Sequence, residues 1–308
     1  MSGHFALLNR LRDGSGMFDF ISEEIRKIEA GVRGEDRLVD RLNELRLSGE
    51  FRFFSDVCLE LGDWKVQIDC LVVTDRCCIV LESKNISGRL YFNEELDEFY
   101  KEENGVETPI SNPYFQLMRH IRFMKEFLRT TLPQIKVTGA VIMTAKSCRI
   151  MQKPTHYPIF KLESMIERVT QMYNSAGETS FSDEELDVVE KFLLEGRSAF
   201  VYPPLCEHYR ISPGEIRPGV ECPGCGVLGM RRVYTTWNCR ACGKNDRYAH
   251  ISAVRDYFWI IDKKITNKEF RRFCMIDSKY AASRMLNSMD LIAHGSGPSR
   301  YFKENKKK

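Results

Sequence analysis

Hydrophobic and polar residues follow two different periods along residues 31–200, and these periods predict helices and strands in turn. Apolar residues recur at helical spacing after Gly34-Glu35, which predicts a helix that opens there. Three apolar runs, around 52–61, 66–73 and 77–84, are rich in β-branched and aromatic residues and predict strands. We therefore expect an α/β domain in this part of the chain.

The pattern changes on both sides of that domain. Residues 1–30 predict a leader with one helical segment. The stretch 201–219 is rich in proline and glycine and predicts a linker. Short strand signals follow at 220–246, and residues 248–304 predict three helices and a β-hairpin. The chain is thus expected to carry two small modules after its α/β domain.

Four cysteines in the first of these modules have the spacing of a metal site. Cys222 and Cys225 form one Cys-x₂-Cys pair, and Cys239 and Cys242 form a second pair after a short intervening segment. Four thiolates at this spacing can surround Zn²⁺ as a tetrahedron. The pattern predicts a zinc ribbon with a structural zinc, and the alternatives are two disulfides or four buried thiols.

Composition sets the broad class of the chain. It has 308 residues, of which 43% are hydrophobic and 29% are charged, as is usual for soluble globular proteins. No apolar run is long enough to span a bilayer, and no signal peptide opens the sequence. Eleven cysteines, an odd number with four at metal spacing, favour a reducing compartment. We expect a cytoplasmic protein that does not enter a membrane.

Charge divides the chain unevenly. Residues 231–308 hold 18 Lys and Arg against 7 Asp and Glu, a net charge of +11. Residues 1–230 hold 28 against 36, a net charge of −8. A basic C-terminal part suggests a polyanionic partner, most simply nucleic acid, and DNA in particular.

The α/β domain contains a set of residues suited to a metal-dependent reaction. Asp69 interrupts the second predicted strand, and Glu82 and Lys84 end the third on one face. Together with Glu35 from the preceding helix, the two strand carboxylates could offer hard oxygen ligands to Mg²⁺. Lys84 beside them could orient a water molecule and offset phosphate charge. This arrangement is typical of a metal-dependent phosphodiesterase.

The same positions resemble a known family. Its motifs are matched by Gly34-Glu35, by Ile68-Asp69, by Leu81-Glu82-Ser83-Lys84-Asn85 with Gly88, and by Asn112-Pro113-Tyr114-Phe115-Gln116. The stretch of about 31–145 resembles the nuclease-related domain, NERD, of the PD-(D/E)xK nucleases. The resemblance implies a restriction-endonuclease-like fold, a mixed sheet flanked by helices. It also implies Mg²⁺- or Mn²⁺-dependent nuclease chemistry by Glu35, Asp69, Glu82, Lys84 and Gln116.

Each of these residues also has a plain structural explanation. A Glu-x-Lys pair is commonly a surface ion pair. Glu35 would be favourable in the first turn of a helix, where the helix dipole attracts negative charge. Gln116 could be a helix-surface amide. An inactivated nuclease fold that only binds nucleic acid would keep most of the same sequence.

The last module resembles a winged helix-turn-helix. Its third helix would enter a major groove and offer Lys279, Ser283, Arg284 and Asn287, while Arg300 in the hairpin would contact phosphate. The alternative is a helical bundle that binds a protein or a second copy of itself. Charge favours DNA over that alternative.

Taken together, the sequence predicts an Mg²⁺-dependent nuclease that cuts DNA and is targeted by a zinc ribbon and a winged helix. One alternative is a non-catalytic DNA-binding regulatory protein with a degenerate nuclease fold. A protein-interaction adaptor is another. The sequence is also compatible with a homodimer.

Overall fold

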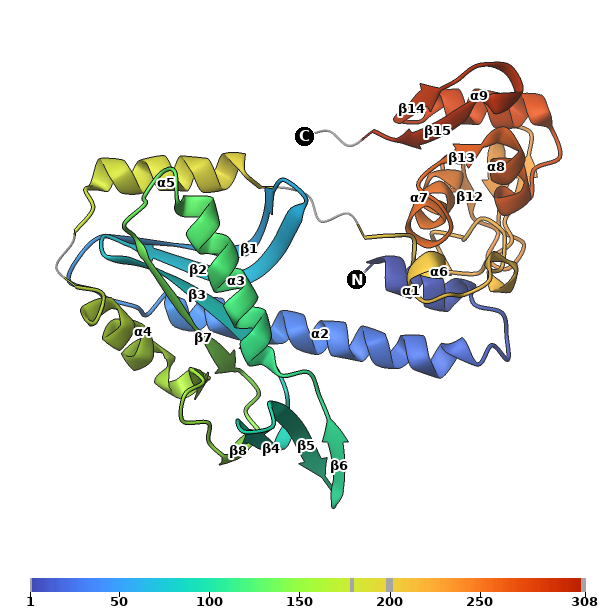
Figure 1. The fold of residues 1–308 in the computed structure, drawn as a ribbon. Helices are drawn as coiled ribbons and strands as arrows, with labels where there is room; N and C mark the ends of the chain where they lie inside the picture. The colour runs from blue at the N-terminus through green and yellow to red at the C-terminus, as the bar shows by residue number, and fades with distance from the viewer. Residues whose placement is uncertain (1, 178–179, 198–201, 306–308) are drawn as a thin grey trace. The chain divides into compact units, whose positions relative to one another are not determined.

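The computed structural model describes residues 2–177, 180–197 and 202–305 (Figure 1). These residues form two compact units. The sheet unit comprises the described residues from 28 to 197, and the ribbon unit combines residues 2–27 with 202–305. The boundary near residue 200 lies close to the one that the sequence predicts, but the two ends of the chain share one unit.

A five-stranded sheet forms the centre of the sheet unit. Its strands run in the order β1 (Phe51–Leu61), β2 (Trp64–Thr74), β3 (Cys77–Lys84), β7 (Lys136–Met143) and β9 (Ile159–Lys161). The first three strands are antiparallel, whereas β3, β7 and β9 are parallel to one another. The three strands predicted from sequence are therefore confirmed, and the sheet is mixed.

Helices cover both faces of this sheet because its central strands are apolar on both sides. On one face lie α3 (Pro113–Leu128) and α5 (Asp183–Glu195), which share a core with alternate residues of β2, β3 and β7. On the other face lie the C-terminal part of α2 (Met17–Leu42) and α4 (Met165–Asn174), after a 3₁₀ turn at Leu162–Ser164. The unit is a three-layer α/β fold.

A small second sheet adjoins the carboxyl end of β3. It has four strands in the order β6 (Val106–Pro109), β5 (Glu98–Glu103), β4 (Gly88–Asn93) and β8 (Cys148–Gln152). Strand β4 is antiparallel to β5 and parallel to β8. This sheet lies beyond the end of β3 that carries Lys84 (Figure 1).

The first helices differ from the sequence prediction. Helix α1 spans Ser2–Arg10, and α2 runs without a break from Met17 to Leu42. The prediction that a helix opens at Gly34-Glu35 is wrong, because that position lies well inside α2. Ile21 in the first half of the helix and Leu38 in the second half are each buried in a separate hydrophobic core, and this packing outweighs the low helix propensity of Gly31 and Gly34.

The ribbon unit contains a small three-stranded sheet beside its helices. The sheet consists of β10 (Arg231–Val233), β11 (Thr236–Asn238) and β12 (Asn245–Asp246), all antiparallel. Residues 202–219, predicted as a linker, instead form α6 (Leu205–His208) and a 3₁₀ turn at Pro213–Glu215. Leu205, Cys206 and Ile216 are buried in the core of the unit, so this stretch is part of a folded module.

The helices and hairpin predicted for the C-terminal part are confirmed. They are α7 (His250–Ile260), β13 (Ile265–Thr266), α8 (Asn267–Cys274), α9 (Lys279–Ser288), β14 (Leu291–His294), a 3₁₀ turn at Gly297–Ser299, and β15 (Tyr301–Glu304). Thr266 and Glu269 form a capping box at the start of α8. Strand β15 pairs with both β14 and β13. The winged-helix interpretation of this order stays a prediction.

Among the described residues, no helix is both long enough and apolar enough to cross a bilayer.

Candidate functional site

Two carboxylates meet where β2 and β3 stop pairing. Cys70 lies opposite Leu81 in the antiparallel register, so Asp69, one residue before Cys70, is next to Glu82, one residue after Leu81, on the neighbouring strand. An Oδ2 atom of Asp69 accepts a hydrogen bond of 2.7 Å from the backbone N–H of Ser83. Glu82 has no exposed surface. The sheet thus holds two acidic groups side by side at its edge.

Helix α3 brings two polar side chains to the same edge. Asn112 caps the helix by accepting a 3.1 Å hydrogen bond from the Tyr114 N–H, with Pro113 in the first turn. One turn further, Gln116 Oε1 accepts a 2.9 Å hydrogen bond from Lys84 Nζ. The same ammonium group lies 4.0 Å from Glu82 Oε2. Lys84 is therefore held between a carboxylate and an amide.

His120 is a residue of this edge that sequence reasoning does not assign to the site, because its preferred interpretation is a packed or surface histidine. Its ring is buried, and Nδ1 is hydrogen-bonded to Glu82 Oε1. The only signal in the sequence is its spacing, one helical turn after Gln116, and that spacing does not reveal a partner 38 positions earlier. His120 therefore supports Glu82 from the side of α3.

Close packing of α2 places Glu35 at this edge. A Cβ atom on Gly34 would lie 2.6 Å from Thr144 Oγ1 and 2.9 Å from Asn85 Cβ, so only glycine allows this approach. Glu35, the next residue, is partly buried. Burial raises the pKa of its carboxyl group, and the charge of Asp56 adds to the increase. Since Glu35 is not in a first turn, the helix dipole does not explain its position.

The electrostatics of the edge favour a cation. Burial raises the pKa of Asp69 to about 7, with Glu82 as the next contributor. Glu82 Oε2 is buried and, among the described residues, has no hydrogen-bond partner. Buried carboxylates crowded in this way are stabilised by a positive charge, and hard oxygen donors suit Mg²⁺. The donor set therefore fits that ion, although these three carboxylates do not form a tight group of donors among the described residues.

Comparison with protein families agrees with this geometry. Residues 30–144 match the nuclease-related domain, NERD. The matched range covers the end of α2, strands β1 to β7 and helix α3. The matched segment contains Glu35, Asp69, Glu82, Lys84, Gln116 and His120. Comparisons with curated proteins and with solved structures found no significant match.

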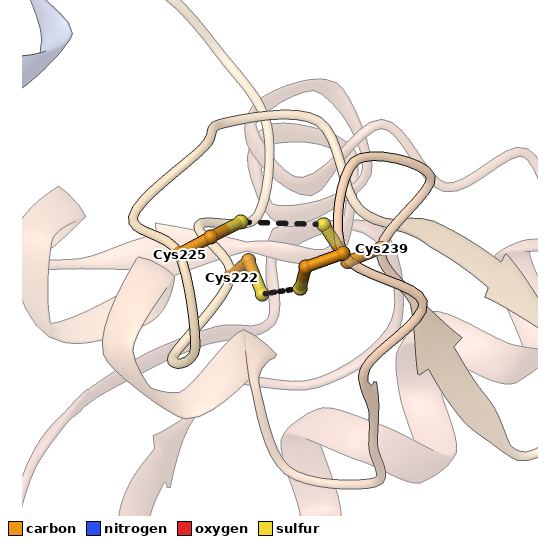
Figure 2. Close-up of side chains that lie close together, drawn as sticks. Cys222, Cys225 and Cys239 are labelled. Carbon is orange, nitrogen blue, oxygen red and sulfur yellow. Dashed lines mark hydrogen bonds between the residues drawn. The ribbon is translucent and has the colours of Figure 1, made fainter.

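The four cysteines of the ribbon unit form the second site. Their sulfur atoms all lie within 4.8 Å of one another. Cys222 Sγ is 3.6 Å from Cys242 Sγ, and Cys225 Sγ is 3.6 Å from Cys239 Sγ (Figure 2). A tetrahedron with Zn–S bonds of about 2.3 Å has edges of about 3.8 Å, whereas a disulfide needs about 2.05 Å. The thiols therefore fit a zinc ion and are not disulfides.

Trp237 supports the ribbon from within. It is fully buried, and its indole N–H donates a 3.2 Å hydrogen bond to His250 Nδ1. Burial lowers the pKa of His250 to about 4, and nearby Arg232 contributes to the decrease. Trp237 packs inside the module and has no face available for stacking on a base.

The residues predicted to contact DNA lie on α9 and the hairpin of the ribbon unit. Lys279, Arg284 and Arg300 are exposed, but Ser283 Oγ accepts a 2.9 Å hydrogen bond from Asn267 Nδ2. Asn287 Oδ1 accepts a 2.8 Å hydrogen bond from Arg300 Nη2. The structure thus brings Asn287 and Arg300 together across helix and hairpin. Their contacts with nucleic acid stay a prediction.

Proposed function

We propose that the chain is a divalent-metal-dependent nuclease that hydrolyses phosphodiester bonds of DNA. One observation carries the proposal: Asp69, Glu82 and Lys84 meet at one sheet edge inside the segment that matches the nuclease-related domain. Acidic oxygen donors beside a lysine are the groups that metal-assisted phosphodiester hydrolysis requires.

Each residue at the edge has a part in this proposal. Glu35, Asp69 and Glu82 would hold Mg²⁺, or Mn²⁺ in its place, which supplies Lewis-acid stabilisation of phosphate charge when bound. Gln116 fixes the Lys84 ammonium group through their 2.9 Å hydrogen bond. The ammonium group offsets charge on the scissile phosphate and orients the attacking water. His120 holds the Glu82 carboxylate through α3.

The ribbon unit would target the enzyme to its substrate. A structural Zn²⁺ at the four cysteines would fix the ribbon. Helix α9 and the hairpin would then present Lys279, Arg284 and Arg300, with Ser283 and Asn287, to nucleic acid. The net charge of +11 over residues 231–308 supports this part of the proposal. The eleven cysteines, none in a disulfide, support a reducing cytoplasm as the location.

A second candidate is a non-catalytic DNA-binding protein with a degenerate nuclease fold. It is favoured because Glu35, Asp69 and Glu82 do not form a tight group of three metal donors among the described residues. The hydrogen bond between His120 and Glu82 also favours it, since one ligand oxygen is already engaged.

A plasmid assay with Mg²⁺, Mn²⁺ or EDTA tests the proposal. The full chain should nick or cut DNA with either metal and not in EDTA. Lys84→Ala should lower the rate by at least about 100-fold, as loss of a group that stabilises transition-state charge does. Asp69→Ala should abolish cleavage. Lys101→Ala, which removes a lysine paired with Glu103 on β5, is the matched control and should cleave normally.

The other outcomes separate the alternatives. DNA binding without cleavage under either metal would overturn the nuclease proposal and favour the non-catalytic protein. No affinity for nucleic acid at moderate salt would favour the protein-interaction adaptor.

A further inference from the structure

The outer face of α3 is basic, although the part of the chain to which it belongs is acidic. Residues 1–230 carry a net charge of −8. Along α3, however, the exposed positions after Phe115 are Arg119, Arg122, Lys125, Glu126 and Arg129. These positions recur every three or four residues, so they lie on one side of the helix. The arrangement concentrates positive charge along one line.

Most of this charge is uncompensated. Glu126 forms an ion pair with Arg129, with 3.0 Å between Glu126 Oε1 and Arg129 Nη2. Arg119, Arg122 and Lys125 form no ion pair among the described residues. By contrast, the exposed Lys65 is paired with Glu60 at 2.6 Å, and the half-buried Arg52 is paired with three acids of α5. The three free charges on α3 are therefore available to an anionic ligand.

A cavity extends the basic face at the C-terminal end of α3. It measures about 790 Å³ and lies between α3, the start of β2 and the start of β7. Its lining includes one acidic residue, four basic residues and one aromatic residue: Glu126, Arg122, Lys125, Arg129, Lys136 and Trp64. Trp64 is fixed edge-to-face on Phe123, with ring centroids 5.2 Å apart. The cavity is thus cationic with one aromatic wall.

The opposite end of α3 reaches the carboxylate edge. Gln116, in the first turn, binds Lys84, and thirteen residues separate it from Arg129. At 1.5 Å per residue this distance is about 20 Å. Nucleotides rise about 3.4 Å each along a strand of B-DNA, so the face spans about six of them. Helix α3 runs across the sheet (Figure 1).

We infer that the outer face of α3 binds the phosphate backbone of the nucleic acid that enters the carboxylate edge. Arg119, Arg122 and Lys125 would contact successive phosphates on one side of the scissile bond, and the cavity beside Trp64 would receive the strand beyond them. The inference rests on the proposed function, because it takes the same nucleic acid as the ligand.

Binding in EDTA separates this inference from catalysis. The triple variant Arg119→Gln, Arg122→Gln and Lys125→Gln should bind a labelled 30-base-pair duplex about tenfold more weakly than the unaltered full chain near 0.15 M salt. The slope of log affinity against log salt should become shallower by about 0.9 for each lost contact. All three side chains are exposed, so folding should be unchanged by circular dichroism and thermal melting.

A matched variant controls for net charge. Lys65→Gln, Lys101→Gln and Lys191→Gln remove the same three charges from the sheet unit, but each lysine there is paired with a glutamate. This variant should keep its affinity and its salt slope. Equal losses in the two triple variants, or no loss in either, would overturn the inference.

A photocrosslinking residue locates the contact. A benzophenone amino acid at position 122 should crosslink to DNA, whereas one at position 191 on α5 should not. Crosslinks at neither position, or equally at both, would contradict an α3 contact. If the chain never cleaves with Mg²⁺ or Mn²⁺ but these binding results hold, the nuclease proposal fails and this inference stands.

Discussion

Glu82 shows how one buried residue connects the fold to a candidate reaction. Its carboxylate has no exposed surface and is bonded to His120 on one oxygen. The second oxygen has no hydrogen bond among the described residues and lies 4.0 Å from Lys84 Nζ. A buried carboxylate with one unsatisfied oxygen is costly for folding. That cost is understandable if the residue is kept for binding a cation.

Replacing His120 should make the energetic cost of burying the Glu82 carboxylate measurable. His120→Leu leaves Glu82 without a donor, so we expect the free energy of unfolding to fall by about 1–3 kcal/mol. His120→Gln has an amide that can still donate to the carboxylate and should lose less. Urea unfolding of the two variants measures the difference. Equal losses would mean that His120 matters only by filling space.

His250 should make the ribbon unit sensitive to acid. Its pKa is about 4 in the folded protein against an ordinary value of 6.5, because it is buried and lies near the positive charge of Arg232. As pH falls below 6.5 the unfolded chain therefore takes up a proton first. The stabilisation is complete above pH 6.5 and is lost as pH falls towards 4, by at most about 1.4 kcal/mol per unit.

A His250→Gln variant isolates this effect. Gln can still accept the Trp237 hydrogen bond but does not titrate. Urea unfolding at a fixed zinc concentration, at pH 7 and at pH 5.5, should show a larger loss of stability in the unaltered protein. Parallel losses in both proteins would assign the acid sensitivity to other groups, such as the zinc thiolates.

The sequence predicts only part of the carboxylate edge. Asp69, Glu82 and Lys84 are recognisable because each ends or interrupts an apolar strand. A polar residue is unexpected at such a position unless it has a specific role. Gln116 depends on the family resemblance. His120 was not recognisable, because a histidine on the apolar face of a helix has many ordinary explanations and its partner is distant in sequence. Pairwise contacts of this kind require the folded chain.

At the scale of elements, strands were easier to predict than helix ends. Strand β3 begins at Cys77 and ends at Lys84, as its apolar run predicts. Helix α2 was predicted to open at Gly34-Glu35, and instead begins at Met17. Gly34 is there because α2 packs closely against Thr144 and Asn85, not because the helix starts. A glycine at such a position can therefore mark either the start of a helix or a close packing contact. Only the contacts in the folded structure distinguish these two explanations.

The zinc ribbon should depend on its metal. The unaltered chain should contain one zinc per molecule, and Cys225→Ser should lose most of it because three ligands remain. A structural zinc contributes roughly 10–16 kcal/mol to folding of small modules, so chelation should unfold the ribbon strands. Zinc content by atomic emission and hydrogen exchange of residues 220–246 measure both effects.

Cys58→Ser is the matched control, since Cys58 lies on β1 of the sheet unit. It should keep full zinc content. Loss of zinc in both variants would show that the metal is bound elsewhere, and full zinc in Cys225→Ser would remove that thiol from the site.

At the scale of the whole molecule, the two ends of the chain fold together. Arg10 is fully buried and forms a 2.9 Å ion pair with Asp256, 246 residues later. It also donates to the carbonyl of Gly219 at 3.0 Å and lies 4.7 Å from the Phe273 ring centre. Local sequence patterns cannot reveal such contacts. For this reason the sequence alone predicts a leader at residues 1–30 and a linker at residues 201–219.

The two units should unfold in separate transitions, because each has its own hydrophobic core among the described residues. Each unit has a capping box, at Thr266 and at Ser182. Thr266→Ala and Ser182→Ala should each remove about 1 kcal/mol and lower one melting temperature by about 2–4 °C. Calorimetry should show two unfolding peaks. A metal chelator should shift only the peak that Thr266→Ala also shifts. If both variants shift one common peak, the chain unfolds as a single cooperative unit.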